Sequence, residues 1–129
     1  MAFYLAPEVL DNGLAYLQAN CNQVVAVNAY AIGDSYATVM AGSNVTVSAA
    51  MTSADFALSN GASNARVLTN ASKTATASGS GDPTHIVFVN TATSKILGVT
   101  QESSGVSVTA GVSYTIPSTP LEMRQPTAA

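Results

Sequence analysis

The sequence is poor in charged residues, which make up only 9% of its 129 positions. Its four basic residues, Arg66, Lys73, Lys95 and Arg124, are scattered along the chain. Binding to nucleic acid without sequence preference needs many lysine and arginine contacts to phosphates, so we expect no nucleic-acid partner. A neutral surface rich in Ser, Thr, Asn and Ala is typical of a protein packed against other subunits. The alternative is a soluble extracellular monomer with a weakly charged surface.

Cysteine and histidine are also rare, with one residue of each type. Cys21 has no second cysteine with which to form an intrachain disulfide, and we expect it to be a small buried side chain. His85 lacks Cys or carboxylate partners at ligand spacing, so we expect no metal site and no cofactor. At the start of a strand, His85 is expected to make a structural or interface hydrogen bond.

Long apolar runs are missing as well. No stretch reaches the roughly 20 residues that a membrane-spanning helix requires, so we expect no membrane partner. The first residues lack the basic region and long apolar run of a signal peptide. The expected compartment is therefore the cytoplasm in which the chain is made.

One amphipathic helix is predicted near the start, over about residues 7–19. Pro7 suits the first helical position, and Glu8 complements the helix dipole. Leu10, Leu14 and Leu17 recur at a spacing that places them on one face. This apolar stripe either covers the chain's own sheet or contacts a neighbouring subunit, so the three leucines are the candidate interface residues.

The most strand-like region spans residues 84–116. Its first part is apolar on both alternating faces, with Ile86 and Phe88 on one side and Val87 and Val89 on the other, which predicts a central strand. Residues 91–95 suit a hairpin loop back into residues 95–99. Residues 106–116 alternate apolar and polar positions, and we expect them to complete an antiparallel meander that is the most buried part of the domain.

Further strands are predicted from shorter patterns. They lie at residues 24–27, 44–47, 66–69 and 72–78, with a last edge strand around Leu121 and Met123. Residues 49–61 carry a poor signal, compatible with a helical turn or an irregular segment. The expected fold is one all-β domain over residues 1–129, a small sandwich or jelly-roll-like antiparallel structure. It has one N-terminal α-helix, a β part at about 23–124 and a loose tail at 125–129.

A catalytic reading rests on two short motifs. Gly33-Asp34-Ser35-Tyr36 resembles the first block of the GDSL (SGNH) esterases, and Asp82-Pro83-Thr84-His85 has the spacing of their Asp-x-x-His pair. Ser35 would be the nucleophile, His85 the base and Asp82 its orienting carboxylate. Against this, the segment between the motifs has no convincing helices for a parallel α/β sheet, and the oxyanion-donor blocks have no match. We therefore expect no enzyme activity.

The order of these patterns along nearly the whole chain resembles a group of small virion proteins of tailed bacteriophages, often encoded among head-assembly genes. The likeness consists of the following segments: Asp11-x-x-Leu14-x-Tyr16-Leu17, the strand at 24–27, Tyr36-Ala37, Arg66-Val67, Thr84 to Val89, Lys95-Ile96-Leu97, Val108 to Gly111, and Tyr114 to Pro117. The chain departs from the group after Val27, where Asn28-Ala29-Tyr30-Ala31 replaces a polar strand end.

The resemblance implies a capsid decoration or cement protein. Such proteins bind the outside of the mature head, commonly as homotrimers, and clamp neighbouring major capsid proteins. The expected partners are then the chain itself and the major capsid protein, and the expected location is the exterior of the virion. A neck, tail or fibre component of the same virion is the alternative that the sequence leaves open.

Overall fold

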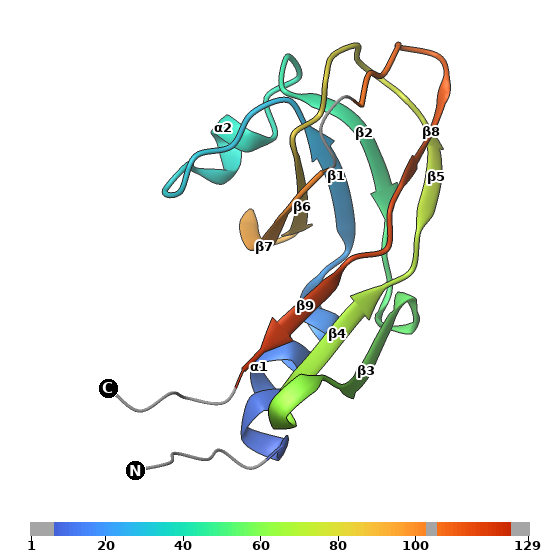
Figure 1. Cartoon of the computed structure of the whole chain (residues 1–129). Coiled ribbons are helices and arrows are strands. Elements are labelled where there is room, and N and C mark those ends of the chain that lie inside the picture. The colour runs from blue at the N-terminus through green and yellow to red at the C-terminus, as the bar shows by residue number, and fades with distance from the viewer. Residues whose placement is uncertain (1–6, 103–105, 125–129) are drawn as a thin grey trace.

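The structure is a computed structural model that describes residues 7–102 and 106–124, and side chains from residue 12 onward. Antiparallel strands dominate it, and helix α1 (Pro7–Asn20) precedes them all (Figure 1). It confirms the predicted all-β domain with one N-terminal helix, and α1 begins at the predicted Pro7. A further single helical turn, α2 (Tyr36–Val39), was not predicted. The tail at 125–129 lies outside the described residues.

The largest sheet has four strands in the order β2-β1-β6-β7. Its members are β1 (Gln23–Val27), β2 (Val45–Ala50), β6 (His85–Asn90) and β7 (Lys95–Gln101). Strand β6 lies between β1 and β7, and its four apolar residues are fully buried, as the two-faced apolar pattern predicted. Strand β7 forms the edge of this sheet.

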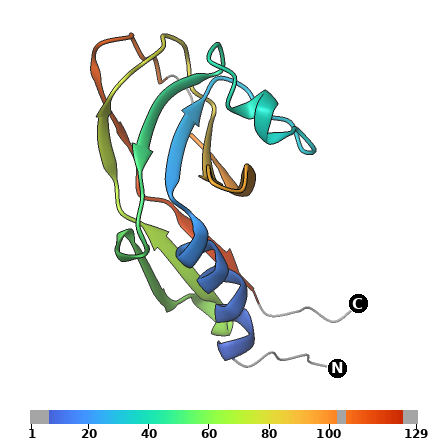
Figure 2. The same cartoon turned by 180° about the vertical axis from the view of Figure 1, so that it is seen from behind.

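Two smaller sheets complete the fold. One has the order β3-β4-β9, built from β3 (Phe56–Asn60), β4 (Arg66–Asn70) and β9 (Pro120–Met123). The other pairs β5 (Lys73–Thr76) with β8 (Ser113–Ile116). Figures 1 and 2 show α1 beside β4 and β9 at one end of the molecule, whereas the β5–β8 ribbon runs along the outside of β2.

The predicted meander over residues 84–116 is only half right. Its first two strands form the hairpin β6–β7, but the third does not return to β7. Strand β8 pairs with β5, with Tyr114 opposite Ala75, and Val108 makes an isolated bridge to Gly81. The alternation of residues 112–116 determines which side chains face inward, but it does not determine the partner strand. Strand β5 offers the backbone of β8 the same antiparallel hydrogen bonds that β7 would offer. Ile116 is fully buried as a result, whereas Val112 is exposed.

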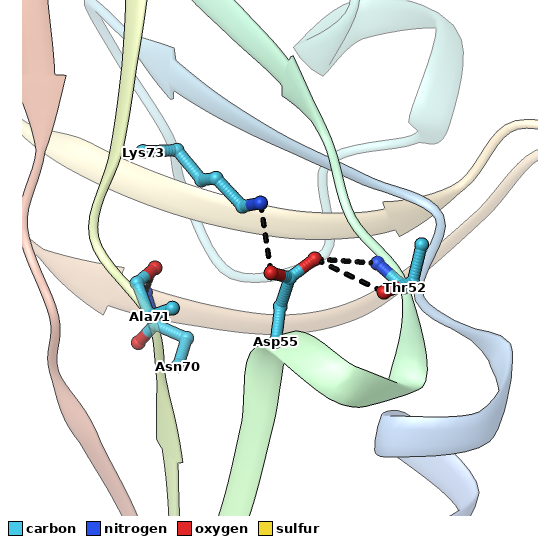
Figure 3. Close-up of polar contacts among 5 residues, drawn as sticks. All are labelled: Thr52, Asp55, Asn70, Ala71 and Lys73. Carbon is cyan, nitrogen blue, oxygen red and sulfur yellow. Dashed lines mark hydrogen bonds and ion pairs between the residues drawn. The ribbon is translucent and has the colours of Figure 1, made fainter.

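The region with a poor sequence signal, residues 49–61, contains a complete strand. A short 3-10 turn at Ser53–Asp55 leads directly into β3, whose first residue, Phe56, is buried. The Asp55 carboxylate accepts a hydrogen bond from the Thr52 backbone N–H at 2.8 Å and pairs with Lys73 Nζ at 2.8 Å (Figure 3). These contacts fix the corner between β2 and β3 against the start of β5.

The core divides into two apolar clusters, one on each face of the large sheet. The larger contains Phe88 and Ile86 of β6, and it extends through Leu14 and Leu17 of α1 to Leu68 of β4. The smaller consists of five buried valines on the opposite face, partly covered by side chains of the segment around α2: Val25, Val27, Val39, Val87 and Val89. Cys21 is buried in the larger cluster, as predicted.

Candidate interaction surface around strand β7

The outer edge of β7 has no strand beside it. One edge pairs with β6 along the strand, and no backbone hydrogen bond links the other edge to any residue that the structure describes. Between Ile96 and Gln101 the strand carries no charged side chain. Unpaired backbone N–H and C=O groups on a neutral strand are suited to pairing with another extended chain.

A first groove lies along β7 on the face of the valine cluster. It has a volume of about 480 Å³ and is lined by residues 96–101 of β7 with Tyr30, Ile32 and His85. The Tyr30 and His85 rings pack at 5.6 Å between centroids, and His85 Nδ1 lies 2.8 Å from the Thr84 hydroxyl. His85 therefore makes a local structural hydrogen bond, one of the two kinds expected, at the rim of a groove lined by both polar and apolar side chains.

Ile32 stands at the rim of this groove with 99% of its surface exposed. It sits in a tight turn in which the Asp34 N–H donates to Ala31 O at 3.0 Å, and Asp34 Oδ2 accepts the Ala31 N–H at 2.9 Å. Gly33 follows with a φ of 96°, a backbone conformation that favours glycine. The Gly33-Asp34 turn predicted from sequence thus holds a large aliphatic side chain in solvent.

A second groove lies on the opposite face of β7, between α1 and β9. Its volume is about 340 Å³, and its lining combines residues 97–99 of β7 with parts of α1 and residues 121–123 of β9. Tyr16 and Met123 border it, 57% and 39% exposed respectively. Gly98 lets the helix come this close, because a Cβ atom there would lie only 3.1 Å from Leu17 Cδ1.

Of the three candidate interface leucines of α1, the structure describes the side chains of Leu14 and Leu17. Leu14 and Leu17 are 5% and 8% exposed and pack into the chain's own core, so only their edges reach the second groove. This corresponds to the alternative in which the helix covers its own sheet. The Leu10 side chain lies outside the described residues. The exposed apolar residues beside the grooves, Tyr16, Ile32 and Met123, were not predicted from the sequence to be surface contacts, although an isoleucine directly before a Gly-Asp turn was a usable signal.

The three residues of the esterase hypothesis are not assembled. Ser35 caps α2, where its Oγ accepts the Thr38 N–H at 3.2 Å, and His85 Nδ1 is bonded to Thr84. No hydrogen bond joins Ser35, Asp82 and His85 within the described part of the chain. In the same part, no group of three His, Cys, Asp or Glu side chains is placed to hold a metal ion.

Burial raises the pKa of the Cys21 thiol to about 11, more than its backbone hydrogen bonds lower it. A thiol that stays protonated at neutral pH is a poor nucleophile, which suits its position in the core.

Across residues 7–102 and 106–124, no helix has the length and apolar character that crossing a membrane requires. No protein-family model, curated protein or solved structure matches the chain.

Proposed function

We propose that this chain is a structural protein of a bacteriophage virion, a capsid decoration or cement protein that binds the outside of the head. The observation that carries the proposal is the surface around β7, where a mixed groove and a mainly apolar groove flank an uncharged strand edge that no described residue pairs with. Surfaces of this kind are protein-binding sites, because burying them costs little desolvation and gains both apolar area and backbone hydrogen bonds.

The overall charge supports binding to protein. The chain has four basic and seven acidic residues, so most of its exterior is neutral. A neutral interface is desolvated at low cost, and its affinity depends only weakly on salt. A homo-oligomer on a shell with many identical junctions gains further affinity through multivalent contact.

The test is to mix purified protein with phage heads that lack it and to image them by cryo-electron microscopy. We expect added density on the outer shell at symmetry-related junctions, and greater resistance of the decorated heads to heat or chelation. Density confined to the neck, tail or fibres of intact virions would instead support the alternative location. Heads without added density would contradict the decoration proposal.

A matched pair of variants makes the test specific to the β7 surface. Tyr16→Asp places a charge beside the second groove, and Val112→Asp places the same charge at a comparably exposed position, 56% against 57%, in the turn before β8. Strands β7 and β8 lie on opposite sides of the molecule in both views (Figures 1 and 2). We expect Tyr16→Asp to weaken head binding and Val112→Asp to leave it unchanged.

A further inference from the structure

We infer that β7 is the contact between two copies of this chain, which pair antiparallel through their free β7 edges around a twofold axis. The two four-stranded sheets would then join into one continuous sheet. This inference rests on the homo-oligomeric part of the proposed function: it gives the β7 edge and the first groove to the second copy and leaves the second groove, beside Tyr16, to the head. A twofold contact builds a dimer, so it departs from the trimer that the phage resemblance implies.

The first argument is that β7 lacks the protection found at other strand edges. The free side of β2 is covered by the N–H groups of Ser78 and Gly79, which donate to Thr46 O at 2.8 and 3.2 Å. At β3, the Gln18 side chain donates to Phe56 O at 3.2 Å. Strand β9 carries Pro120 and Glu122 and has only four residues, and β8 is equally short. Proline, charge, shortness and coverage are the usual defences against edge pairing.

Strand β7 has none of these defences in its middle. It is the longest described strand, with seven residues, and Lys95 at its first position is its one charged residue. A bulge near Leu97, where the register with β6 shifts, bends its first part. The stretch Gly98–Gln101 beyond the bulge is regular and neutral, and no described residue forms a backbone hydrogen bond with its outer side.

The second argument is that the strand is complementary to itself in charge. Lys95 lies at one end of β7, and Glu102 directly follows the other end, where it accepts a hydrogen bond from the Tyr114 hydroxyl. In an antiparallel pair of identical strands, the start of one strand lies beside the end of the other. Because a twofold axis perpendicular to the sheet sets the central residue opposite its own copy, the pair is centred on Val99. The extra residue at the Leu97 bulge shifts the register by one, so Lys95 of each copy lies opposite Glu102 of its partner, a favourable cross-strand pair.

The third argument concerns the apolar side chains on the two faces. A twofold axis perpendicular to the sheet continues each face of one copy into the same face of the other. The first grooves of the two copies then adjoin, and Ile32 of each copy lies over the joined strands. Ile32 is the most exposed large aliphatic residue of the described chain, and in one copy it lies in water. Pairing of two copies would bury it.

The experiment measures the mass of the full chain in solution by analytical ultracentrifugation over a range of concentrations, without phage heads. We expect a dimer, and we expect Ile32→Asp to raise its dissociation constant about tenfold, the effect of losing one well-buried apolar contact. Ile32 makes no core contact, so circular dichroism and the melting temperature should stay unchanged. Val112→Asp, with the same charge on an exposed turn before β8, is the control and should dimerise like the wild type.

A charge variant tests the antiparallel register. Lys95→Glu places two acidic groups at each end of the strand pair and should weaken the dimer, more at low salt than at high salt. A monomer at all concentrations, a trimer, or a dimer that Ile32→Asp and Lys95→Glu leave intact would overturn the inference. A dimer that fails to decorate heads would uphold the inference and overturn the capsid proposal, so the two failures are distinguishable.

Discussion

The side-chain carbonyl of Asn70 accepts the backbone N–H of Thr119 at 2.9 Å and so ties the end of β4 to the segment that enters β9. Asn70 is 2% exposed, and its Nδ2 donates to Pro117 O at 3.1 Å and Ala71 O at 3.2 Å. The buried side-chain amide of Asn70 therefore takes the place of strand-to-strand backbone hydrogen bonds in the segment between β8 and β9.

We expect Asn70→Ala to lower the free energy of unfolding by about 2–3 kcal/mol, because it leaves several half-buried backbone groups without their partner. Chemical denaturation measures this. Asn60→Ala is the control, since Asn60 is exposed and its side chain accepts a solvent-exposed hydrogen bond from the Arg66 side chain rather than one from buried backbone. Equal stability of the two variants would contradict the structural role of Asn70.

Phe88 is fully buried at the centre of the large sheet, and its ring packs against Phe56 at 6.0 Å between centroids. Phe88→Ala should cost about 3–5 kcal/mol of stability, the usual range for truncating a buried aromatic side chain. A melting curve that coincides with that of the wild type would show that the ring is not part of the core. Val112→Ala, at an exposed position, should have little effect.

The Asp55 carboxylate makes stability depend on pH. Its hydrogen bond from Lys73 lowers the pKa below the ordinary value of 3.8. The stabilisation is therefore fully present above the unfolded-state pKa and is lost as the pH falls through the lowered folded-state pKa. Asp55→Asn should destabilise by less than about 1 kcal/mol at neutral pH, since the pair is partly solvated.

Thermal melts of wild type and Asp55→Asn across pH 2 to 7 check this dependence. The gap between their melting temperatures should close as the pH drops below about 4. Asp82→Asn serves as the control, because Asp82 is exposed and forms no ion pair in the described structure. A gap that is constant over the whole range would show that the charge of Asp55 does not stabilise the fold.

The Cys21 thiol should react slowly with an aromatic disulfide reagent near about pH 8. Its raised pKa of about 11 leaves almost no thiolate, and its side chain is 3% exposed. We expect the reaction to accelerate greatly in denaturant, which releases both restraints. Fast labelling of the native protein would place Cys21 at the surface.

We expect no esterase activity. Ser35 is a helix cap, so Ser35→Ala should cost about 0.5–1 kcal/mol through the loss of that bond and change no rate. Hydrolysis of a nitrophenyl ester by the wild type, abolished by Ser35→Ala in a variant that remains folded, would establish the enzyme that the Gly-Asp-Ser motif suggested.

The sequence by itself determined the strands whose pattern is dense. The two-faced apolar run of β6 required cover on both sides, and the spacing of Leu14 and Leu17 required an amphipathic helix. Both features are local, because the spacing of apolar residues along a segment depends only on the sequence of that segment. The same holds for the turn at Gly33-Asp34 and for the hairpin between β6 and β7.

Only the tertiary structure decided which strands meet. Alternation sets the two faces of β8 but not its partner, since any antiparallel strand supplies the same hydrogen bonds, and β5 took the place expected for β7. Burial of Leu14 and exposure of Ile32 likewise depend on what lies opposite, not on hydrophobicity, which the two residues share. The surface around β7 arises for this reason: with β8 paired elsewhere, no described strand pairs with the outer edge of β7.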